Sequence, residues 1–240
     1  MEKLNTAGII GYGQIGKAIA KFYKNPKIKD IGRDDNLKGV DVLNICIPYS
    51  TDFVEIVKKE IAEIKPKLTI IHSTVEPGTT KQIGGMIVHS PIRGVHPYLY
   101  EGIKKFVKYI GADILEAGIM AEEHIRSLGI KPKAFGLSTT TELGKILSTT
   151  YYGLCIAWHG EMEKVCNKLK VDFSQAVTHF NETYNEGYTN LDMKNVARPI
   201  LHPPKGNKIG KHCVIPNAEM LKKYLDSEAL DLILKYKKNG

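Results

Sequence analysis

A glycine-rich turn between a strand and a helix constrains the fold of this chain more than any other feature. Thr6–Ile10 is a short apolar run that predicts a strand, and it leads directly into G-Y-G-Q-I-G at residues 11–16. Lys17–Lys24 follows with apolar residues at helical spacing. A G-x-G-x-x-G pattern is weak evidence on its own, but a strand before it and a helix after it are the context that favours a βαβ unit.

Further strands and helices alternate along the first half of the chain. The nearly continuous apolar run Val40–Ile47 is typical of a strand that is buried on both faces of a parallel sheet. Phe53–Ile64 has the periodicity of an amphipathic helix, which Pro66 stops. Alternation of this kind predicts a doubly wound, Rossmann-like α/β fold with a parallel sheet. The other predicted strands are Ile28–Arg33, Leu68–Ile71 and Met86–Val88.

The pattern becomes helical near Gly136. We interpret Thr139 as an N-cap and Glu142 as its partner in a capping box. They open a long central helix that reaches Leu169, far longer than the usual 11–12 residues. One apolar stripe runs along this helix at spacings of three and four, which predicts packing partners. The stripe comprises Leu143, Leu147, Thr150, Leu154, Trp158, Met162, Val165 and Leu169.

Two more helices are predicted after the central one, at Phe173–Tyr184 and Ala218–Tyr236, with the irregular segment Asn185–Cys213 between them. We interpret Asn217 as the N-cap of the last helix. The sequence therefore predicts two domains. Residues 1–137 form the Rossmann-like domain, and residues 138–240 form an α-helical domain.

Composition excludes several classes of protein. The chain has 240 residues, and 34 Lys and Arg against 26 Asp and Glu give a net charge of +8. No apolar run approaches the roughly 18 residues of a membrane span, and Met1–Asn5 lacks the layout of a signal peptide. The basic residues are scattered, so we expect no nucleic acid or membrane partner. Four widely spaced cysteines argue against a disulfide framework and favour a reducing, cytoplasmic setting.

The glycines of residues 11–16 suit a dinucleotide. In this motif the first glycine makes a tight turn, the second lets a pyrophosphate approach the backbone, and the third lets helix and strand pack closely. The second strand should then end in an acid that binds the adenosine ribose. Asp34 stands about 20 residues beyond the motif, with Asp35 as the alternative. A carboxylate there repels the 2′-phosphate of NADP, so we expect NAD, although Arg33 beside it can bind such a phosphate.

A second informative stretch, H-S-T-V-E-P-G-T-T at residues 72–80, follows a predicted strand and brings Ser73 and Thr74 to the carboxyl edge of the sheet. Together with residues 11–16, I-C-I-P at residues 45–48 and Ser90-Pro91, it resembles the UDP-glucose/GDP-mannose 6-dehydrogenase family. Three later positions are similar to the family as well. They are E-L-G-K at residues 142–145, Glu161, and G-K-H-C at residues 210–213.

The resemblance implies an NAD-dependent enzyme that oxidises the primary alcohol of a nucleotide sugar, and a homodimer across the central helix. It implies that the Cys213 thiolate forms a thiohemiacetal with the aldehyde and that Lys145 stabilises the oxyanion. It further implies that Thr74 helps to place water and that Glu101 supplies the family's later catalytic Glu. The residues expected to hold the cofactor are Gly11, Tyr12, Gly13, Gln14, Ile15, Gly16, Asp34, Pro48, Ser73 and Thr74.

Several positions depart from the family pattern. The chain ends at Gly240, so we expect a truncated form without the family's third domain. The stretch Asp35–Asp41 is also far shorter than the family's. In addition, Ile92 stands in place of a Glu, Thr149 and Gly160 in place of Asn, and Pro216 and Asn217 in place of Lys and Asp.

Two alternatives stay open. One is a dehydrogenase of the 6-phosphogluconate or β-hydroxyacid type, which also uses a central lysine but does not need Cys213. The other is an NAD-binding module without catalytic activity. We expect Cys46, Cys155 and Cys166 to be packing residues. We expect no metal site, because the eight histidines show no metal-ligand spacing.

Overall fold

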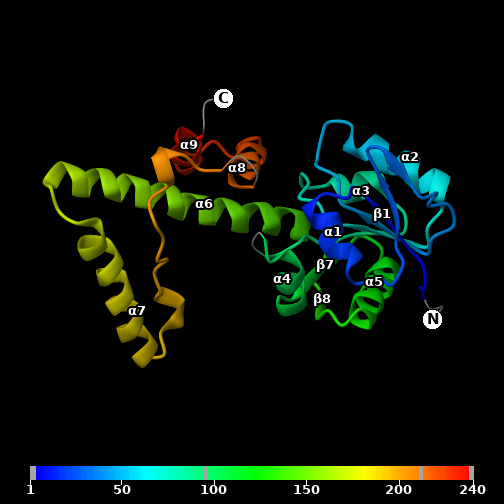
Figure 1. Cartoon of the computed structure of the whole chain (residues 1–240), viewed down its shortest axis with the longest axis horizontal. Coiled ribbons are helices and arrows are strands. Elements are labelled where there is room, and N and C mark those ends of the chain that lie inside the picture. Colours follow the sequence, from blue (N-terminus) through cyan, green and yellow to red (C-terminus); the bar gives the residue numbers. More distant parts are fainter. Residues whose placement is uncertain (1–3, 95–96, 211–212, 238–240) are drawn as a thin grey trace. The chain divides into compact units, whose positions relative to one another are not determined.

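The computed structural model describes residues 4–94, 97–210 and 213–237 of the chain. It separates into two compact units, Met1–Lys145 and Ile146–Gly240. Figure 1 follows the chain from the blue strands of the first unit to the red helix near the C-terminus.

An eight-stranded sheet forms the centre of the first unit within these residues, in the order β3-β2-β1-β4-β5-β6-β7-β8. β2, β1, β4, β5 and β6 run parallel, whereas β3 and β7 are antiparallel to their neighbours β2 and β6. The prediction of a Rossmann-like, mostly parallel sheet is confirmed. The strands are β1 Ala7–Ile10, β2 Lys27–Asp30, β3 Arg33–Asp34, β4 Val42–Ile45, β5 Leu68–Ile71, β6 Ile87–His89, β7 Lys108–Ala112 and β8 Pro132–Ala134.

Helices cover both faces of this sheet (Figure 1). α1, α4 and α5 pack on the face that buries Ile9 and Val42, while α2 and α3 lie over the face that buries Ile10 and Leu43. Neighbouring strand residues are buried on opposite faces because side chains alternate along a strand. The helices are α1 Gln14–Ala20, α2 Phe53–Ile64, α3 Thr79–Ile83, α4 Leu99–Lys105 and α5 Leu115–Ser127.

The predicted strand Ile28–Arg33 is present as β2, but its predicted end is three residues too late, because the chain turns back within it. β2 ends at Asp30, and Gly32 has a φ of +75°, a left-handed conformation that suits glycine. β3 then pairs with β2 as a short edge hairpin. The chain returns from β3 to β4 without a helix, and Leu37 and Val40 are buried in this return. This explains how so short a segment can join the second strand of the unit to the next parallel one.

The predicted long helix is confirmed as α6 (Ser138–Leu169), whose first eight residues belong to the first unit and along whose remainder the helical second unit is built. α8 (Val214–Lys222) and α9 (Glu228–Lys235) pack on α6 around a small core that contains Ala157, Ile215 and Ile233. After α6 the chain forms a π-helical turn, η1 Ser174–His179, which continues into α7 Phe180–Asn190. Two 3₁₀ turns, η2 Lys194–Val196 and η3 Lys205–Asn207, lie between α7 and α8.

Two glycines seven residues apart let the last two helices approach α6 closely. A Cβ on Gly153 would lie 2.2 Å from a methyl carbon of Val214, and a Cβ on Gly160 would lie 2.5 Å from the hydroxyl oxygen of Tyr236. The Tyr236 hydroxyl donates to Glu161 at 2.7 Å, and Lys164 donates to that hydroxyl at 2.9 Å. A tyrosine from the end of the chain therefore fills the space that a side chain at position 160 would take.

Other predictions for this unit are wrong. Ala218–Tyr236 is not one helix, because α8 ends at Lys222 and Ser227 caps a new helix by accepting the Ala229 N–H at 3.3 Å. Asn217 is buried inside α8 and caps nothing. The predicted helix Phe173–Tyr184 runs on to Asn190. Within the described residues, none of the helices has both the length and the apolar character that crossing a bilayer requires.

Much of the predicted apolar stripe on α6 is exposed. The helix instead buries the side that carries Ile146, Gly153, Ala157 and Gly160. α8 and α9 pack against this side and against Leu154 of the stripe, whereas five residues of the stripe remain exposed. Its exposed members are Leu143, Leu147, Trp158, Val165 and Leu169, and Tyr151 joins them.

Candidate functional site

The glycine-rich turn lies at the carboxyl ends of the parallel strands β1 and β4, where the order of the strands in the sheet reverses. Such a switch point is where doubly wound folds bind ligands. Gly11 has a φ of +90°, and a Cβ on it would lie 2.8 Å from the carbonyl carbon of Cys46. A Cβ on Gly16 would lie only 1.9 Å from the Gly11 carbonyl oxygen. Both glycines are therefore required by the fold itself.

Gly13 is different. Its φ is −68°, which any residue can adopt, and a Cβ on it would meet nothing within 4 Å. It is exposed, and no side chain caps the N-terminus of α1 that follows it. The fold does not need a glycine here, but an anion that approaches the backbone of the turn does. The three glycines thus have the geometry that a dinucleotide pyrophosphate requires.

The acid at the end of β2 is Asp30, which the sequence analysis did not select. One of its carboxylate oxygens accepts the backbone N–H of Tyr12 at 3.0 Å, and the other accepts that of Ile31 at 2.9 Å. Asp30 therefore stands beside the glycine-rich turn, at the carboxyl edge of the sheet. The turn residues Ile31-Gly32 after it were the sequence signal for this strand end.

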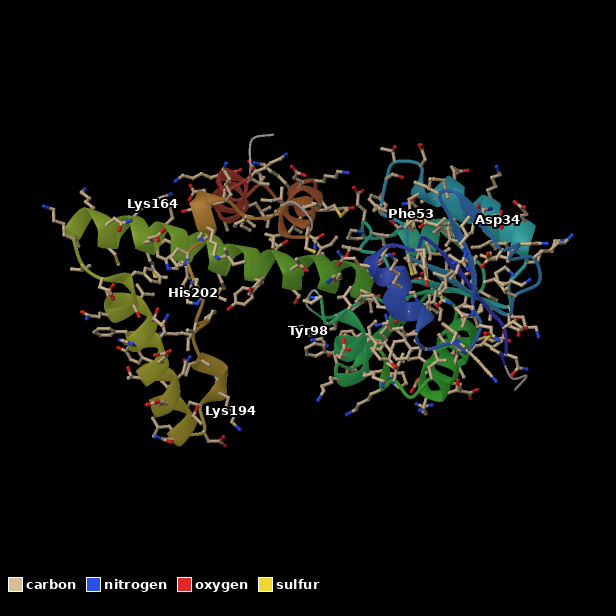
Figure 2. All side chains as sticks on the ribbon, viewed as in Figure 1. Asp34, Phe53, Tyr98, Lys164, Lys194 and His202 are labelled. Atoms are coloured by element: carbon tan, nitrogen blue, oxygen red, sulfur yellow. The ribbon has the colours of Figure 1, made fainter. Side chains whose placement is uncertain are left out.

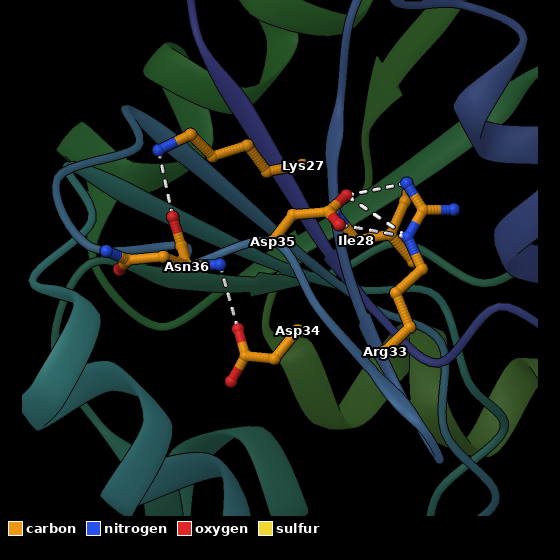
Figure 3. A network of polar contacts seen from close by, with 6 residues as sticks. All are labelled: Lys27, Ile28, Arg33, Asp34, Asp35 and Asn36. Carbon is orange, nitrogen blue, oxygen red and sulfur yellow. Dashed lines mark hydrogen bonds and ion pairs between the residues drawn. The ribbon is translucent and has the colours of Figure 1, made fainter.

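Asp34 and Asp35 lie further along the edge hairpin. Asp34, labelled in Figure 2, is exposed and accepts the backbone N–H of Asn36 at 2.9 Å. Asp35 accepts from the Arg33 guanidinium at 2.6 Å and from the Ile28 backbone at 2.9 Å (Figure 3). The ion pair with Arg33 lowers the pKa of the Asp35 carboxyl. Asp35 thus holds the hairpin and Arg33 in place.

Other predicted cofactor residues follow the ends of β4 and β5. Pro48 is exposed shortly after β4, and Thr74 is half-buried after β5. Ser73 is buried, and its hydroxyl donates to the Ile47 carbonyl at 2.6 Å, which ties the two strand ends together. These residues share the carboxyl edge of the sheet with Gly11–Gly16. Tyr12 and Ile15 are half-buried there, and Gln14 is exposed.

The predicted capping box at the start of α6 is wrong. Glu142 does not turn back to cap the helix, because its carboxylate is buried and accepts hydrogen bonds from Gly78 and Thr80. Thr139 lies within the helix rather than before it. Lys145, one turn after Glu142, is half-buried at the end of the first unit.

A chain of buried polar groups lies under the same edge. The Lys108 ammonium donates to the Ser90 carbonyl, to the Pro91 carbonyl at 3.1 Å and to the Nδ1 atom of His72 at 3.2 Å. The Nε2 atom of His72 in turn lies 2.9 Å from the Oδ1 atom of Asn44. Burial lowers the pKa of Lys108 to about 7 and the pKa of His72 well below its usual value. Nothing in the sequence pattern indicated this cluster.

The remaining predicted catalytic residues belong to helical parts of the chain. Glu101 is exposed on α4, and Cys213 is exposed in the second unit, immediately before α8. Lys211 and His212, which precede this thiol in the sequence, lie outside the described residues. The other cysteines pack as expected: Cys46 and Cys166 are buried and Cys155 is half-buried. Among the described residues, no three His, Cys, Asp or Glu side chains gather as metal ligands.

The curated relatives that the chain matches are UDP-N-acetyl-D-mannosamine dehydrogenases. No protein-family model matches the chain. The UDP-N-acetyl-D-mannosamine dehydrogenase of Pyrococcus horikoshii is 25% identical over 225 residues, which is 84% of this chain and 50% of the relative. The chain is similar to the nucleotide-sugar dehydrogenases. It spans half or less of the length of the curated relatives it matches.

Solved structures show the same fold. The UDP-D-ManNAc dehydrogenase structure from Pyrococcus horikoshii has a TM-score of 0.77 at 19% identity and covers 96% of this chain and 68% of that one. Outside the nucleotide-sugar dehydrogenases, the 3-hydroxyisobutyrate dehydrogenase of Mycobacterium tuberculosis has a TM-score of 0.71 at 13% identity, and the match covers 98% of this chain and 94% of that one. The resemblance found in the sequence motifs is therefore confirmed.

Proposed function

We propose that the chain is a dehydrogenase that binds NAD at the carboxyl edge of its sheet and oxidises the primary alcohol of a nucleotide sugar. The observation that carries the proposal is Gly13, a glycine which the fold does not need, between two that it does need. The similarity to UDP-N-acetyl-D-mannosamine dehydrogenases supports the class of substrate.

The residues at this edge fit the cofactor. Gly11–Gly16 would hold the pyrophosphate, and Asp30, in the place expected for Asp34, would accept the hydroxyls of the adenosine ribose. Pro48, Ser73 and Thr74 would line the edge further along the sheet. NAD bound there supplies the acceptor for the hydride of the alcohol. Because a carboxylate repels a 2′-phosphate, NAD binds more tightly than NADP.

The other steps belong to the chain's own side chains. Lys145 would stabilise the negative charge that develops on the reacting oxygen, and Glu101 would supply the family's later Glu. The Cys213 thiolate would form a C–S bond with the aldehyde carbon while the carbonyl oxygen takes up a proton. The adduct would then give up its C–H hydrogen as a hydride, for which a second NAD is the acceptor, and its O–H proton to water, which leaves a thioester. Water, placed by Thr74, then breaks the C–S bond and releases the carboxylic acid and the free thiol.

The experiment is a panel of UDP-sugars and hydroxy acids incubated with the chain and NAD, with NADH followed by its absorbance. We expect NADH from at least one UDP-sugar. We expect Cys213→Ala to lose the second NADH per sugar while it keeps the first. NADH from hydroxy acids alone, unchanged by Cys213→Ala, would overturn the proposal in favour of a β-hydroxyacid dehydrogenase. NAD binding without any turnover would favour a non-catalytic module.

We also propose that the chain forms a homodimer along the exposed stripe of α6. The stripe is apolar over most of the helix, and five of its residues stay exposed although Leu154 packs against the core under α8 and α9. Large apolar side chains exposed in a row along one helix favour an interface.

A further inference from the structure

Glu142 is a buried carboxylate that joins two of the sequence motifs. It has no exposed surface, and both of its oxygens are engaged. One accepts the Gly78 backbone N–H at 2.5 Å. The other accepts the Thr80 backbone N–H at 2.8 Å and the Thr80 hydroxyl at 2.6 Å. These three donors are neutral, and burial raises the pKa of the carboxyl. A buried carboxylate held in this way fixes the geometry of its donors, because leaving them unpaired is costly.

Residues 73–78 form the loop that joins β5 to α3, and Glu142 holds its Gly78 end. Thr141, the residue of α6 before Glu142, holds the Ser73 end through His89. The Thr141 hydroxyl lies 2.8 Å from the Nδ1 atom of His89, whose Nε2 atom lies 3.1 Å from the Ser73 carbonyl oxygen. Both side chains are buried. Thr74 therefore stands between two anchored points, with Ser73 held through His89 and Gly78 held by Glu142.

Glu142 therefore links the position of this loop to the position of Lys145. Lys145 follows Glu142 by three residues on the same helix, so the two lie about one turn apart. A further contact of this end of α6 does not involve the loop, because the Ser138 hydroxyl donates to the Asp113 carboxylate. The first residues of α6, which belong to the first unit, thus make several contacts within it, and among them Glu142 bonds directly to Gly78 and Thr80.

We propose that Glu142 is a positioning residue, which holds Thr74 and Lys145 at a fixed separation so that water and the developing oxyanion meet them together. This inference rests on the proposed function. Its consequence is that Glu142 affects the chemical step without touching the substrate or the glycine-rich turn. Misplacing a catalytic group by about 1 Å can lower a rate a hundredfold.

The test compares Glu142→Gln with Asp113→Asn. The amide introduced at position 142 would turn an N–H group toward one of the loop's donors, whereas the Asp113 change weakens a contact of the same helix end without touching the loop. We expect Glu142→Gln to lower kcat by roughly ten- to a hundredfold. The Kd for ADP-ribose, which probes only the Gly11–Gly16 side, should change less than about twofold, as it does for any variant that leaves a site intact. Asp113→Asn should leave both quantities near wild type.

Equal losses of kcat in both variants would show that Glu142 only docks the helix, and an unchanged kcat in Glu142→Gln would overturn the proposal directly. Thr80→Val, which removes a single donor, should give a smaller loss in the same direction if Glu142→Gln does not fold. Hydrogen exchange at the Gly78 and Thr80 amides separates this proposal from the proposed function. If wild type oxidises no sugar, the function fails, whereas faster exchange in Glu142→Gln still supports the link and unchanged exchange refutes it.

Discussion

Gly13 and Gly16 differ in what a methyl group would do to the chain. At Gly13 it would meet no atom, so Gly13→Ala should leave the free energy of unfolding unchanged or raise it by up to about 1 kcal/mol, because alanine has less freedom to lose on folding. The same methyl should block a pyrophosphate and weaken NAD binding by roughly tenfold or more, about 1.4 kcal/mol. Calorimetric titration with NAD and urea unfolding measure the two effects. If Gly13→Ala bound NAD with wild-type affinity, the cofactor would not bind at this turn.

The acid at the end of β2 gives a second prediction. Asp30→Ala should weaken NAD binding by about 1.5–3 kcal/mol, the usual worth of hydrogen bonds to a charged group. Asp34→Ala is the matched control, because Asp34 bonds only to the backbone of its own turn among the contacts described, and we expect NAD affinity to stay within about twofold. Isothermal titration of both variants with NAD and NADP shows which of the two aspartates binds the ribose. A larger loss in Asp34→Ala would restore Asp34 as the ribose ligand.

Lys108 makes the stability of the chain depend on pH. Its folded pKa of about 7 lies below the unfolded value of about 10.4, so between these values the unfolded chain binds the extra proton. The free energy of unfolding should therefore rise with pH across this window, by up to roughly 5 kcal/mol from this group. Urea unfolding at several pH values should show that Lys108→Met loses this rise, whereas Lys81→Met, at an exposed lysine of α3, keeps it. Parallel curves for wild type and Lys108→Met would contradict the prediction.

At the scale of elements, Gly160 should limit how α9 packs on α6. Gly160→Ala would place a Cβ 2.5 Å from the Tyr236 hydroxyl, so we expect a loss of about 1–3 kcal/mol, as for other overpacked cores. Gly144→Ala on the same helix meets nothing within 4 Å and should instead stabilise by about 0.5–1 kcal/mol. Urea unfolding of the two variants gives the comparison. Equal stability of both would mean that α9 does not rest on Gly160.

Elements with strong local signals could be predicted from the sequence, and others could not. α2 and β5 have the predicted bounds, because an amphipathic or apolar run ends there at a clear stop. β7 was not predicted, since Lys108 and Gly111 interrupt its apolar pattern, and their burial depends on partners far along the chain. The break between α8 and α9 was also missed, although Ser227 before Glu228 is an N-cap signal.

In the candidate site, too, the sequence predicts a residue's role only where neighbouring residues determine that role. The roles of Gly11 and Gly16 follow from the spacing of the motif, because a local turn fixes them. Asp30 was missed since the strand end was placed three residues late, and a hairpin is decided by Gly32. Glu142 was assigned to its own helix, whereas its partners lie more than 60 residues away. Local spacing cannot choose between a near and a distant donor.

At the scale of the whole molecule, the uncovered stripe of α6 predicts association. We expect light scattering to give the mass of a dimer at micromolar concentration. Trp158 lies on the stripe with 56% of its surface exposed, and as the single tryptophan its fluorescence should shift on dilution. Trp158→Lys should give a monomer, because a buried charge without a partner is costly. Asn167→Lys, exposed on another side of α6, adds the same charge and should remain a dimer. A wild-type monomer would refute the interface.

Gly13, the glycine that the fold does not need, also has a consequence for the evolution of sequences related to this chain. Every replacement of Gly16 adds at least one carbon atom that collides with the turn, so selection for folding alone is enough to keep it in any descendant of this chain. Gly13 has no such protection, and a lineage that stopped using the dinucleotide would accept alanine or serine there without losing the fold. In a family tree, a branch that keeps glycine at position 16 but replaces it at position 13 would therefore be one in which cofactor binding was lost. A branch that keeps glycine at both positions is one in which binding is still under selection.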